Sequence, residues 1–390
     1  MDAVSVTSPR GFKAQGVASG IKPAGQLDLA VLSASGPVPA AAVFTKNHAA
    51  AAPVKLSKKH LASGQGITAV VVNAGCANAA TGVQGDAAAR QMAETTSAAL
   101  GCSVSEVLVA STGMIGTQLP MIGVQDGILR AVAGLDDSLE AANRAAKAIL
   151  TTDSVTKEVL IPADGFTVGA MVKGSGMIRP NMATMLAFIT TDAVVEPECL
   201  DKVLHSAVDV SFNSLNIDGC ESTNDTAILL ASGESGVKPL TGSLNEAVTQ
   251  ACVDLAEMMA RDAEGASRLV SIMVTGAPNN RIARAAGRAM SDSALARAAF
   301  YGGDPNWGRL IAALGASDVK FDPANFTVAY QGVMVADRGA GVDYDAPDLL
   351  EQMEKGDLEI DVAIGSGPGR ARVLTTDLTP DYVRFNGERS

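Results

Sequence analysis

The sequence predicts an α/β protein of the mixed (α+β) kind, in which mixed sheets are covered by helices. Two observations support this fold class. Apolar runs of strand length alternate along the chain with longer segments of helical periodicity. In addition, 47% of the 390 residues are hydrophobic and only 18% are charged, so the chain can bury a large core. This length allows two domains of ordinary size.

Runs rich in Val, Ile and Leu predict the strands of these sheets. The segments "TAVVVN" and "EVLVAS" are typical examples, because each is short, apolar and followed by turn-forming residues. The complete set comprises residues 26–34, 68–73, 106–111, 157–162, 166–172, 184–190, 226–231, 268–275, 326–336 and 357–374.

Helical periodicity predicts the layers between these strands. In the segment 243–262, apolar residues recur every three or four positions and would form one buried face; they are Leu244, Val248, Cys252, Leu255 and Met259. The expected helices are 85–100, 138–150, 197–210, 243–262 and 278–299.

Charge and cysteine usage exclude several classes of partner. The net charge is −12 and the sequence has no cluster of Lys and Arg, so we expect no binding to nucleic acid. Five scattered cysteines without a Cys-x-x-Cys pair indicate reduced thiols. We find neither a secretory signal pattern nor an apolar stretch of membrane-spanning length. The sequence therefore predicts a cytoplasmic protein without a membrane partner.

Familiar metal and nucleotide sites are also not predicted. The three histidines lack the spacing of a zinc site, and Gly-x-Ser-x-Gly is absent. The Gly-rich segments 173–178 and 365–370 do not fit dinucleotide or P-loop spacing. We therefore expect no metal and no cofactor.

Eight polar clusters remain as candidates for a site. Each one alone is explained by a loop whose Asn, Asp, Ser, Thr and Gly residues satisfy the backbone, but eight of them in one chain favour a functional site. They are "NAGCANAATG" (73–82), "STGMIG" (111–116), "TTD" (151–153), "KGSGMIRPNMAT" (173–184), "DGCESTNDT" (218–226), "DAEGAS" (262–267), "GGDPNWGR" (302–309) and "DLTPDYVRFN" (377–386).

Thr184 stands at the start of an apolar run, directly after a segment containing Gly176 and Pro180. One interpretation is that Thr184 simply begins a strand. The other is that the Ala183–Thr184 bond is cut, because a Thr with a free α-amine can act as a nucleophile without a His. These residues alone leave both interpretations open.

These motifs, taken together and in order, resemble the ornithine acetyltransferase family, also called glutamate N-acetyltransferase. The resemblance spans essentially the whole chain, from "PRGFKAQGVASGIK" to "DLTPDYVRFN". It implies a self-cleaving enzyme of arginine biosynthesis. Such an enzyme moves the acetyl group of N2-acetyl-L-ornithine to L-glutamate through an acetyl-Thr intermediate.

The family's functional residues map onto matching motifs of this chain. The resemblance implies that Thr184 is the nucleophile and that Thr112 and Gly113 stabilise the oxyanion. It further implies substrate contacts from five residues, which are Thr152, Lys173, Thr184, Glu264 and Asn386. A hydroxyl and a Gly N–H suit an oxyanion, and a Lys and a Glu suit the two charges of an amino acid.

The resemblance also carries expectations about architecture and assembly. Cleavage between Ala183 and Thr184 would give an α chain, 1–183, with the oxyanion and substrate-binding half, and a β chain, 184–390. The family fold has mixed sheets between helix layers, of the N-terminal-nucleophile type shared with β-aminopeptidases, and the cleaved chains form an α2β2 heterotetramer. Acetyl-CoA stays open as a second acetyl donor.

Two other functions are compatible with the same residues. An N-terminal-nucleophile aminopeptidase of the β-peptide-cleaving type would use the same self-cleavage but transfer the acyl group to water. A small-molecule binding protein would hold a ligand in its polar loops and would keep an intact chain. The acyl acceptor separates the first alternative from the acetyltransferase, and chain cleavage separates the second.

Overall fold

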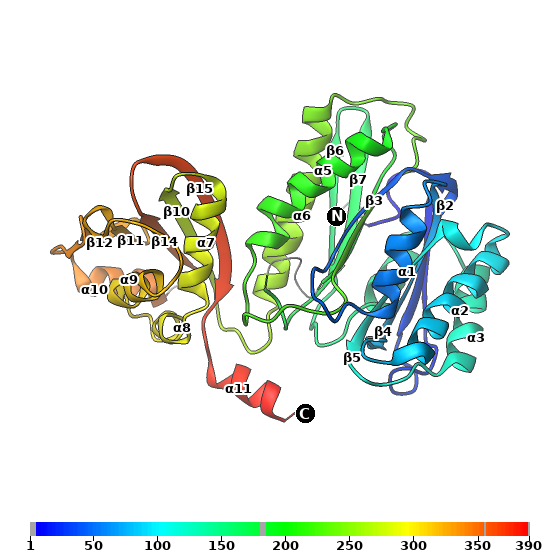
Figure 1. Cartoon of the computed structure of the whole chain (residues 1–390), viewed down its shortest axis with the longest axis horizontal. Coiled ribbons are helices and arrows are strands. Elements are labelled where there is room, and N and C mark those ends of the chain that lie inside the picture. The colour runs from blue at the N-terminus through cyan, green and yellow to red at the C-terminus, as the bar shows by residue number, and fades with distance from the viewer. Residues whose placement is uncertain (1–4, 180–184, 355, 389–390) are drawn as a thin grey trace. The chain divides into compact units, whose positions relative to one another are not determined.

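The computed structural model describes residues 5–179, 185–354 and 356–388 (Figure 1). These residues form two compact units. The described part of the first unit consists of residues 5–174, 185–211 and 221–259, and that of the second consists of 175–179, 212–220, 260–354 and 356–388. Both units are mixed α/β, which confirms the predicted fold class.

The first unit contains two mixed sheets. One has the order β1-β2-β4-β5, in which only β4 and β5 run parallel; its strands are β1 (Phe12–Val17), β2 (Leu29–Val38), β4 (Ile67–Cys76) and β5 (Val107–Met114). The other has the order β3-β9-β8-β7-β6, in which only β8 and β9 run parallel; its strands are β3 (Ala40–Phe44), β6 (Lys157–Ala163), β7 (Phe166–Lys173), β8 (Leu186–Thr191) and β9 (Thr226–Ala231).

The two sheets of the first unit pack face to face. Alternate residues of β4 show why, since Val70 and Val72 join the core between the sheets while Val71 joins a separate core on the outer face. Phe188 of β8 and Ile228 of β9 contribute to the shared core from the other side. The period-2 pattern of these strands thus lets one sheet bury both of its faces.

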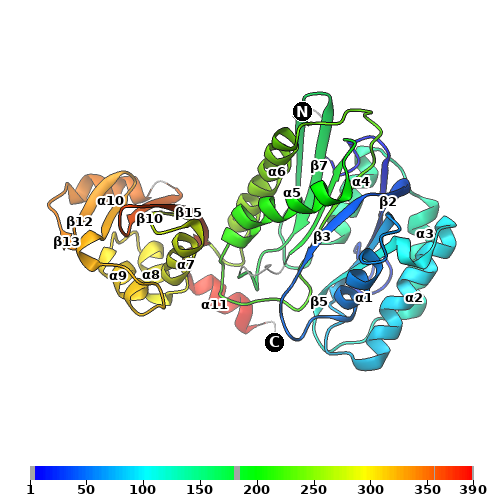
Figure 2. The ribbon, with the colours of Figure 1, turned by 45° about the horizontal axis from the view of Figure 1, so that its top comes forward.

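Helices cover the outer faces of this sandwich. On its outer face the first sheet carries α1 (Ala52–Leu61), α2 (Gly82–Leu100) and α3 (Met121–Ala133). Helix α4 (Leu139–Ala148) packs against β1 and β2 on the inner side instead, where Ala142 and Ala145 join the core shared by the two sheets. The second sheet carries α5 (Pro197–Val210), and α6 (Thr241–Arg261) runs beside α5 (Figure 2). The predicted apolar face of α6 is completely buried. The expectation of sheets between helix layers is therefore confirmed for the first unit.

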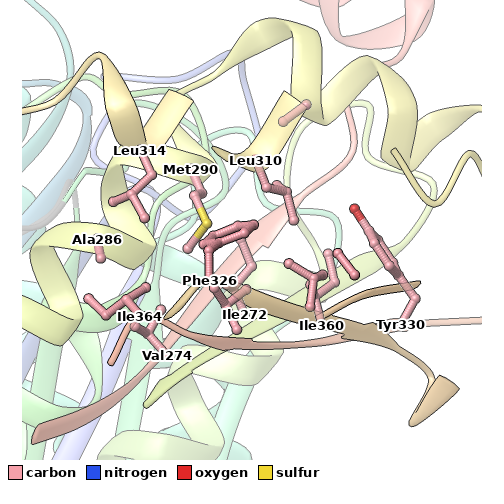
Figure 3. Close-up of a cluster of buried hydrophobic side chains, with 14 of the residues drawn as sticks. Ile272, Val274, Ala286, Met290, Leu310, Leu314, Phe326, Tyr330, Ile360 and Ile364 are labelled. Atoms are coloured by element: carbon pink, nitrogen blue, oxygen red, sulfur yellow. The ribbon is translucent and has the colours of Figure 1, made fainter. Parts of the chain in front are cut away.

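The second unit contains a third mixed sheet, with the order β13-β12-β11-β14-β10-β15. Its strands are β10 (Leu269–Gly276), β11 (Thr327–Tyr330), β12 (Val333–Asp337), β13 (Ala340–Gly341), β14 (Leu358–Ala363) and β15 (Gly367–Thr376). Its helices are α7 (Asn280–Ser291), α8 (Ala294–Tyr301), α9 (Trp307–Gly315), α10 (Ala346–Glu354) and α11 (Pro380–Gly387). Figure 3 shows the apolar core, in which Ile272 and Ile360 of the sheet lie beneath Met290 of α7 and Leu310 of α9.

Several elements differ from the sequence-based prediction. The expected strand 326–336 is a hairpin, because Gln331 and Gly332 both adopt positive φ and reverse the chain between β11 and β12. The expected strand 357–374 is likewise two strands, β14 and β15. The expected helix 278–299 is divided where Ser293 caps the start of α8. The prediction missed several helices and strands, namely β1, β3, β13, α1, α3, α9, α10 and α11.

The two compact units do not coincide with the expected halves 1–183 and 184–390. Strands β7 and β8 pair with each other in one sheet, with Lys173 opposite Leu186, so the first unit contains chain from both sides of residue 183. The expected halves concern a cut peptide bond rather than folding units, and they stay a prediction. Ala183 and Thr184 themselves lie outside the described residues.

Candidate active site

Polar residues collect in the first unit where strands of its two sheets end or begin. In the first sheet, the parallel strands β4 and β5 end side by side at the clusters "NAGC" and "STGM". In the second sheet, β7 ends at Lys173, opposite the start of β8, and β8 begins level with β9. Parallel strands place their ends at a common edge, so four polar clusters meet here.

Thr112 and Gly113 occupy the end of β5. The Thr112 side chain is buried, at 5% exposure. Gly113 has φ +125°, and a Cβ at this position would lie only 2.2 Å from the carbonyl carbon of Gly75 in β4. Only glycine tolerates this conformation and this close approach. The structure therefore explains why the sequence requires Gly directly after Thr112.

Lys173 connects the two sheets. Its side chain is buried, at 3% exposure, and its Nζ donates a hydrogen bond of 3.4 Å to the Oγ1 of Thr112. Two residues predicted to serve the oxyanion and the substrate are thus in contact. A buried ammonium requires a compensating carboxylate, and the charge of Lys173 acts on the carboxyl group of Asp153.

Asp153 has a fully buried side chain that meets two lysines. Its Oδ1 accepts a hydrogen bond from Lys157 Nζ at 2.8 Å and another from the N–H of Gly174 at 2.6 Å. Burial by itself would raise the pKa of Asp153, but the charges of Lys173 and Lys157 outweigh burial and lower the pKa to about 2. Asp153 is therefore ionised at neutral pH, between two buried cations.

Asn224 joins the start of β9 to the ends of β4 and β5. Its Nδ2 donates to the carbonyl oxygens of Ala77 at 2.6 Å and Ser111 at 2.8 Å. Ser111 in turn donates from Oγ to the Oδ1 of Asn73 at 2.6 Å. Because Ser111 directly precedes Thr112, this buried network fixes the backbone that carries the predicted oxyanion donors.

Asp225 follows Asn224 and is completely buried. Its Oδ1 accepts a hydrogen bond of 3.1 Å from the N–H of Met185. Burial raises the pKa of Asp225 well above its ordinary value, and neither this hydrogen bond nor the charge of Lys173 offsets the burial. The pKa values of two aspartates near Lys173 are therefore shifted in opposite directions, since that of Asp153 is lowered and that of Asp225 is raised.

The remaining predicted residues lie in different places. Thr152 is half-buried in the turn before β6, next to Asp153. Glu264 and Asn386 belong to the second unit. Asn386 Nδ2 donates a hydrogen bond of 3.2 Å to the carbonyl oxygen of Tyr382. Burial raises the pKa of Tyr382 to about 12, and the charge of Glu264 adds to this increase. The nucleophile, Thr184, lies outside the described residues.

Sequence reasoning missed three members of this site, which are Asp153, Asn224 and Asp225. All three stand in clusters that the sequence singled out, "TTD" and "DGCESTNDT". The polar clusters therefore indicated the right segments, but a sequence pattern does not indicate which residue of such a cluster becomes buried.

The fold and the site define an α/β enzyme whose hydroxyl, glycine and ammonium groups meet at the edges of two packed sheets. In the described part of the chain, no group of three or more His, Cys, Asp or Glu residues could hold a metal ion. Among these same residues, no helix combines the length and the apolar character that crossing a membrane requires.

The chain belongs to the ArgJ family, whose model matches residues 13–390. It is similar to the arginine biosynthesis bifunctional protein ArgJ of Thermobifida fusca, with 45% identity over 388 residues that cover 99% of this chain and 100% of the relative. The protein of that name from Mycobacterium tuberculosis is 43% identical over 396 residues, 100% of this chain and 97% of the relative. A solved structure of the Bacillus halodurans protein is 31% identical, covers 51% of this chain and 96% of that chain, and has a TM-score of 0.49. The family resemblance seen in the sequence is thus confirmed.

Proposed function

We propose that this protein transfers the acetyl group of N2-acetyl-L-ornithine to L-glutamate in arginine biosynthesis, through an acetyl ester on Thr184. The observation that carries the proposal is the match to the ArgJ family over residues 13–390. Relatives that share 43–45% of their residues are named as bifunctional arginine biosynthesis proteins. The contact between Lys173 and Thr112 supports a site for a polar, charged substrate.

The nucleophile is formed by self-cleavage between Ala183 and Thr184. The hydroxyl of Thr184 attacks the carbonyl carbon of Ala183, the carbon–nitrogen bond breaks, and the nitrogen takes up a proton to become an amine. Water then hydrolyses the resulting ester, which leaves a carboxylate on Ala183 and a free hydroxyl on Thr184. The new α-amine is the base that a Thr nucleophile requires.

Acetyl transfer then follows in two half-reactions. The Thr184 amine accepts the hydroxyl proton while the oxygen attacks the acetyl carbon, and the proton passes to the departing nitrogen of ornithine. The amine of glutamate attacks the acetyl ester in the second half-reaction and regenerates the hydroxyl. In both, the hydroxyl of Thr112 and the N–H of Gly113 donate to the oxyanion, which is the largest stabilising effect in acyl transfer of this kind.

Charged groups orient the two amino acids. Lys173 is a buried cation that suits a substrate carboxylate, and Glu264 suits an ammonium group. Thr152 and Asn386 add hydrogen-bonding groups. Ornithine and glutamate bind in turn, so we expect these residues to serve both half-reactions.

The finer properties follow from the same proposal. The cleaved chains, 1–183 and 184–390, assemble as an α2β2 heterotetramer of the N-terminal-nucleophile type in the cytoplasm. The second activity in the relatives' name "bifunctional" supports acetyl-CoA as an additional acetyl donor for glutamate. The partners are therefore small molecules and copies of the enzyme itself.

A denaturing gel and an acceptor assay test this proposal together. Purified protein should give two fragments, the second of which begins with Thr184, and the Thr184→Ala variant should stay intact and inactive. Acetyl groups supplied on N-acetylornithine should appear on glutamate rather than as free acetate. Release of acetate without transfer would favour the aminopeptidase-like alternative, and an intact chain that binds without turnover would favour a binding protein.

A further inference from the structure

A groove of about 520 Å³ between α1 and α2 carries positive charge. Lys55 and Lys59 of α1 line it together with Arg90 of α2, and the two helices pack side by side (Figures 1 and 2). Among the described residues that line the groove, Asp86 is the one acidic residue. A positive groove in a chain of net charge −12 favours a negatively charged ligand at this place.

The three cations of the groove are available to such a ligand. Their side chains are exposed and form no hydrogen bond and no ion pair with another described residue. Lys59 stands in the last turn of α1, where a cation stabilises the helix in any case. Lys55 stands in the first turn of α1 and Arg90 in the middle of α2, so helix stability does not explain either of them.

The groove continues into a second cavity, of about 240 Å³. The two hollows share three lining residues, Ala52, Lys55 and Asp86. Much of the wall of the second cavity is apolar, and the apolar residues are Ala49, Ala50, Ala52, Ala80 and Ile115. Taken together, the two volumes fall within the roughly 300–1,000 Å³ that is usual for the binding site of a small molecule.

The second cavity adjoins the backbone that carries the candidate oxyanion donors. Ile115 lines the cavity and stands three residues after Thr112, so their Cα atoms are at most about 11 Å apart. Thr223 lines the cavity as well, directly before Asn224, whose side chain donates to the carbonyl oxygen of Ser111 at 2.8 Å. A ligand with its charged part in the groove can therefore extend an uncharged arm toward the end of β5.

We propose that the groove between α1 and α2 binds the phosphates of acetyl-CoA, and that the second cavity receives the arm that carries its thioester. This inference rests on the proposed function, in which acetyl-CoA is an additional acetyl donor. Lysine and arginine are the usual partners of phosphate groups, and the long, uncharged arm suits an apolar cavity. In the net reaction, the acetyl carbon exchanges its bond to sulfur for a bond to the nitrogen of glutamate, and a proton of that nitrogen passes to the thiol.

Two acetyl donors test the phosphate contacts separately from the arm. S-acetylpantetheine has the arm and the thioester of acetyl-CoA but no phosphate. The informative variants are Lys55→Glu and Arg90→Glu, which reverse one charge of the groove each. The matched control is Lys202→Glu, because Lys202 is an exposed lysine on α5, which covers the other sheet. The measurements are KM and kcat for both donors with glutamate as acceptor, and the midpoint of thermal unfolding.

We expect each groove variant to raise KM for acetyl-CoA about 3- to 30-fold, because an exposed attraction is replaced by a repulsion. KM for S-acetylpantetheine should change less than about twofold, since a donor without phosphate makes no ionic contact with the groove. Salt should raise the wild-type KM for acetyl-CoA but not that for S-acetylpantetheine, because salt screens exposed charges. Lys202→Glu should leave both values unchanged.

Three results would overturn the inference. A wild-type enzyme that does not use acetyl-CoA has no such site. An unchanged KM for acetyl-CoA in both groove variants would show that its phosphates bind elsewhere, and equal changes for the two donors would show that these residues do not act on phosphate. If a charge-reversed variant does not unfold cooperatively, Lys55→Gln and Arg90→Gln decide by the same comparison. A wild-type enzyme that transfers no acetyl group from N-acetylornithine contradicts the proposed function instead.

Discussion

Replacing Asp153 with Asn should reveal how strongly the two buried lysines depend on one carboxylate. The Asp153 side chain is fully buried and lies 2.8 Å from Lys157 Nζ, and the charge of Lys173 acts on it as well. An Asn side chain of nearly the same shape removes the negative charge and leaves both ammonium groups buried. Breaking a buried pair in this way is strongly destabilising.

The pKa of Asp153 gives the magnitude and the sign of the effect. Its folded-state pKa of about 2 is lower than the ordinary 3.8, so the folded protein binds this proton more weakly than the unfolded chain does. The ionised carboxylate then contributes on the order of 2 kcal/mol to the free energy of unfolding at neutral pH. This contribution is fully present above about pH 5 and is lost as the pH falls toward 2.

Urea denaturation of wild type and Asp153→Asn at several pH values measures this difference. We expect the variant to be less stable by at least ~2 kcal/mol at pH 7, with a gap that narrows steadily below pH 5. The control is Asp126→Asn, because Asp126 pairs with Arg130 on the exposed surface and should change stability by less than ~1 kcal/mol. A gap that is independent of pH, or no larger than that of the control, would refute the electrostatic role of Asp153.

Three further predictions concern the ends of β4, β5 and β9. Thr112→Ala should lower kcat by roughly 10²–10³ without unfolding the protein, as expected for one oxyanion donor; a loss below about threefold in steady-state kinetics would make Thr112 a turn residue only. Gly113→Ala should destabilise the protein by at least ~1–3 kcal/mol in thermal unfolding, because φ +125° and the backbone of β4 leave no room for a Cβ, and unchanged stability would contradict this geometry. Asn224→Leu should reduce the free energy of unfolding by about 2 kcal/mol, because its hydrogen bonds to Ala77 and Ser111 are lost. If the decrease in kcat, converted to an activation free energy, is smaller than this loss of stability, Asn224 has no role in placing Thr112.

The sequence predicted the central strands well because their patterns are local. The apolar runs at 68–73 and 106–111 correspond to β4 and β5, and the apolar face of 243–262 corresponds to α6. The hairpin between β11 and β12 was missed because the valines on both sides of Gln331 read as one continuous run. The short strands β1 and β3 were missed because neither is a run rich in Val, Ile and Leu, and β3 in addition depends on β9, a partner far away in sequence.

The candidate site was predicted only in part, for a related reason. The resemblance to the family indicated Thr112, Gly113 and Lys173, and the structure brings these residues to one edge of the sandwich. The residues that support them act through burial and pairing, which depend on the folded chain. Asp153 and Asp225 belong to equally polar clusters in the sequence, but only the structure shows that one faces lysines and the other faces a backbone N–H.

The most direct test of the account is to find the acetyl group on the enzyme. Cleaved protein mixed with N-acetylornithine alone should release ornithine in a burst and carry one acetyl group on Thr184 of the fragment 184–390, as a mass spectrum of that fragment would show. Addition of glutamate should then remove the acetyl group and yield N-acetylglutamate. An unmodified fragment, together with steady-state kinetics that require both amino acids to be bound at once, would contradict an acetyl-Thr184 intermediate.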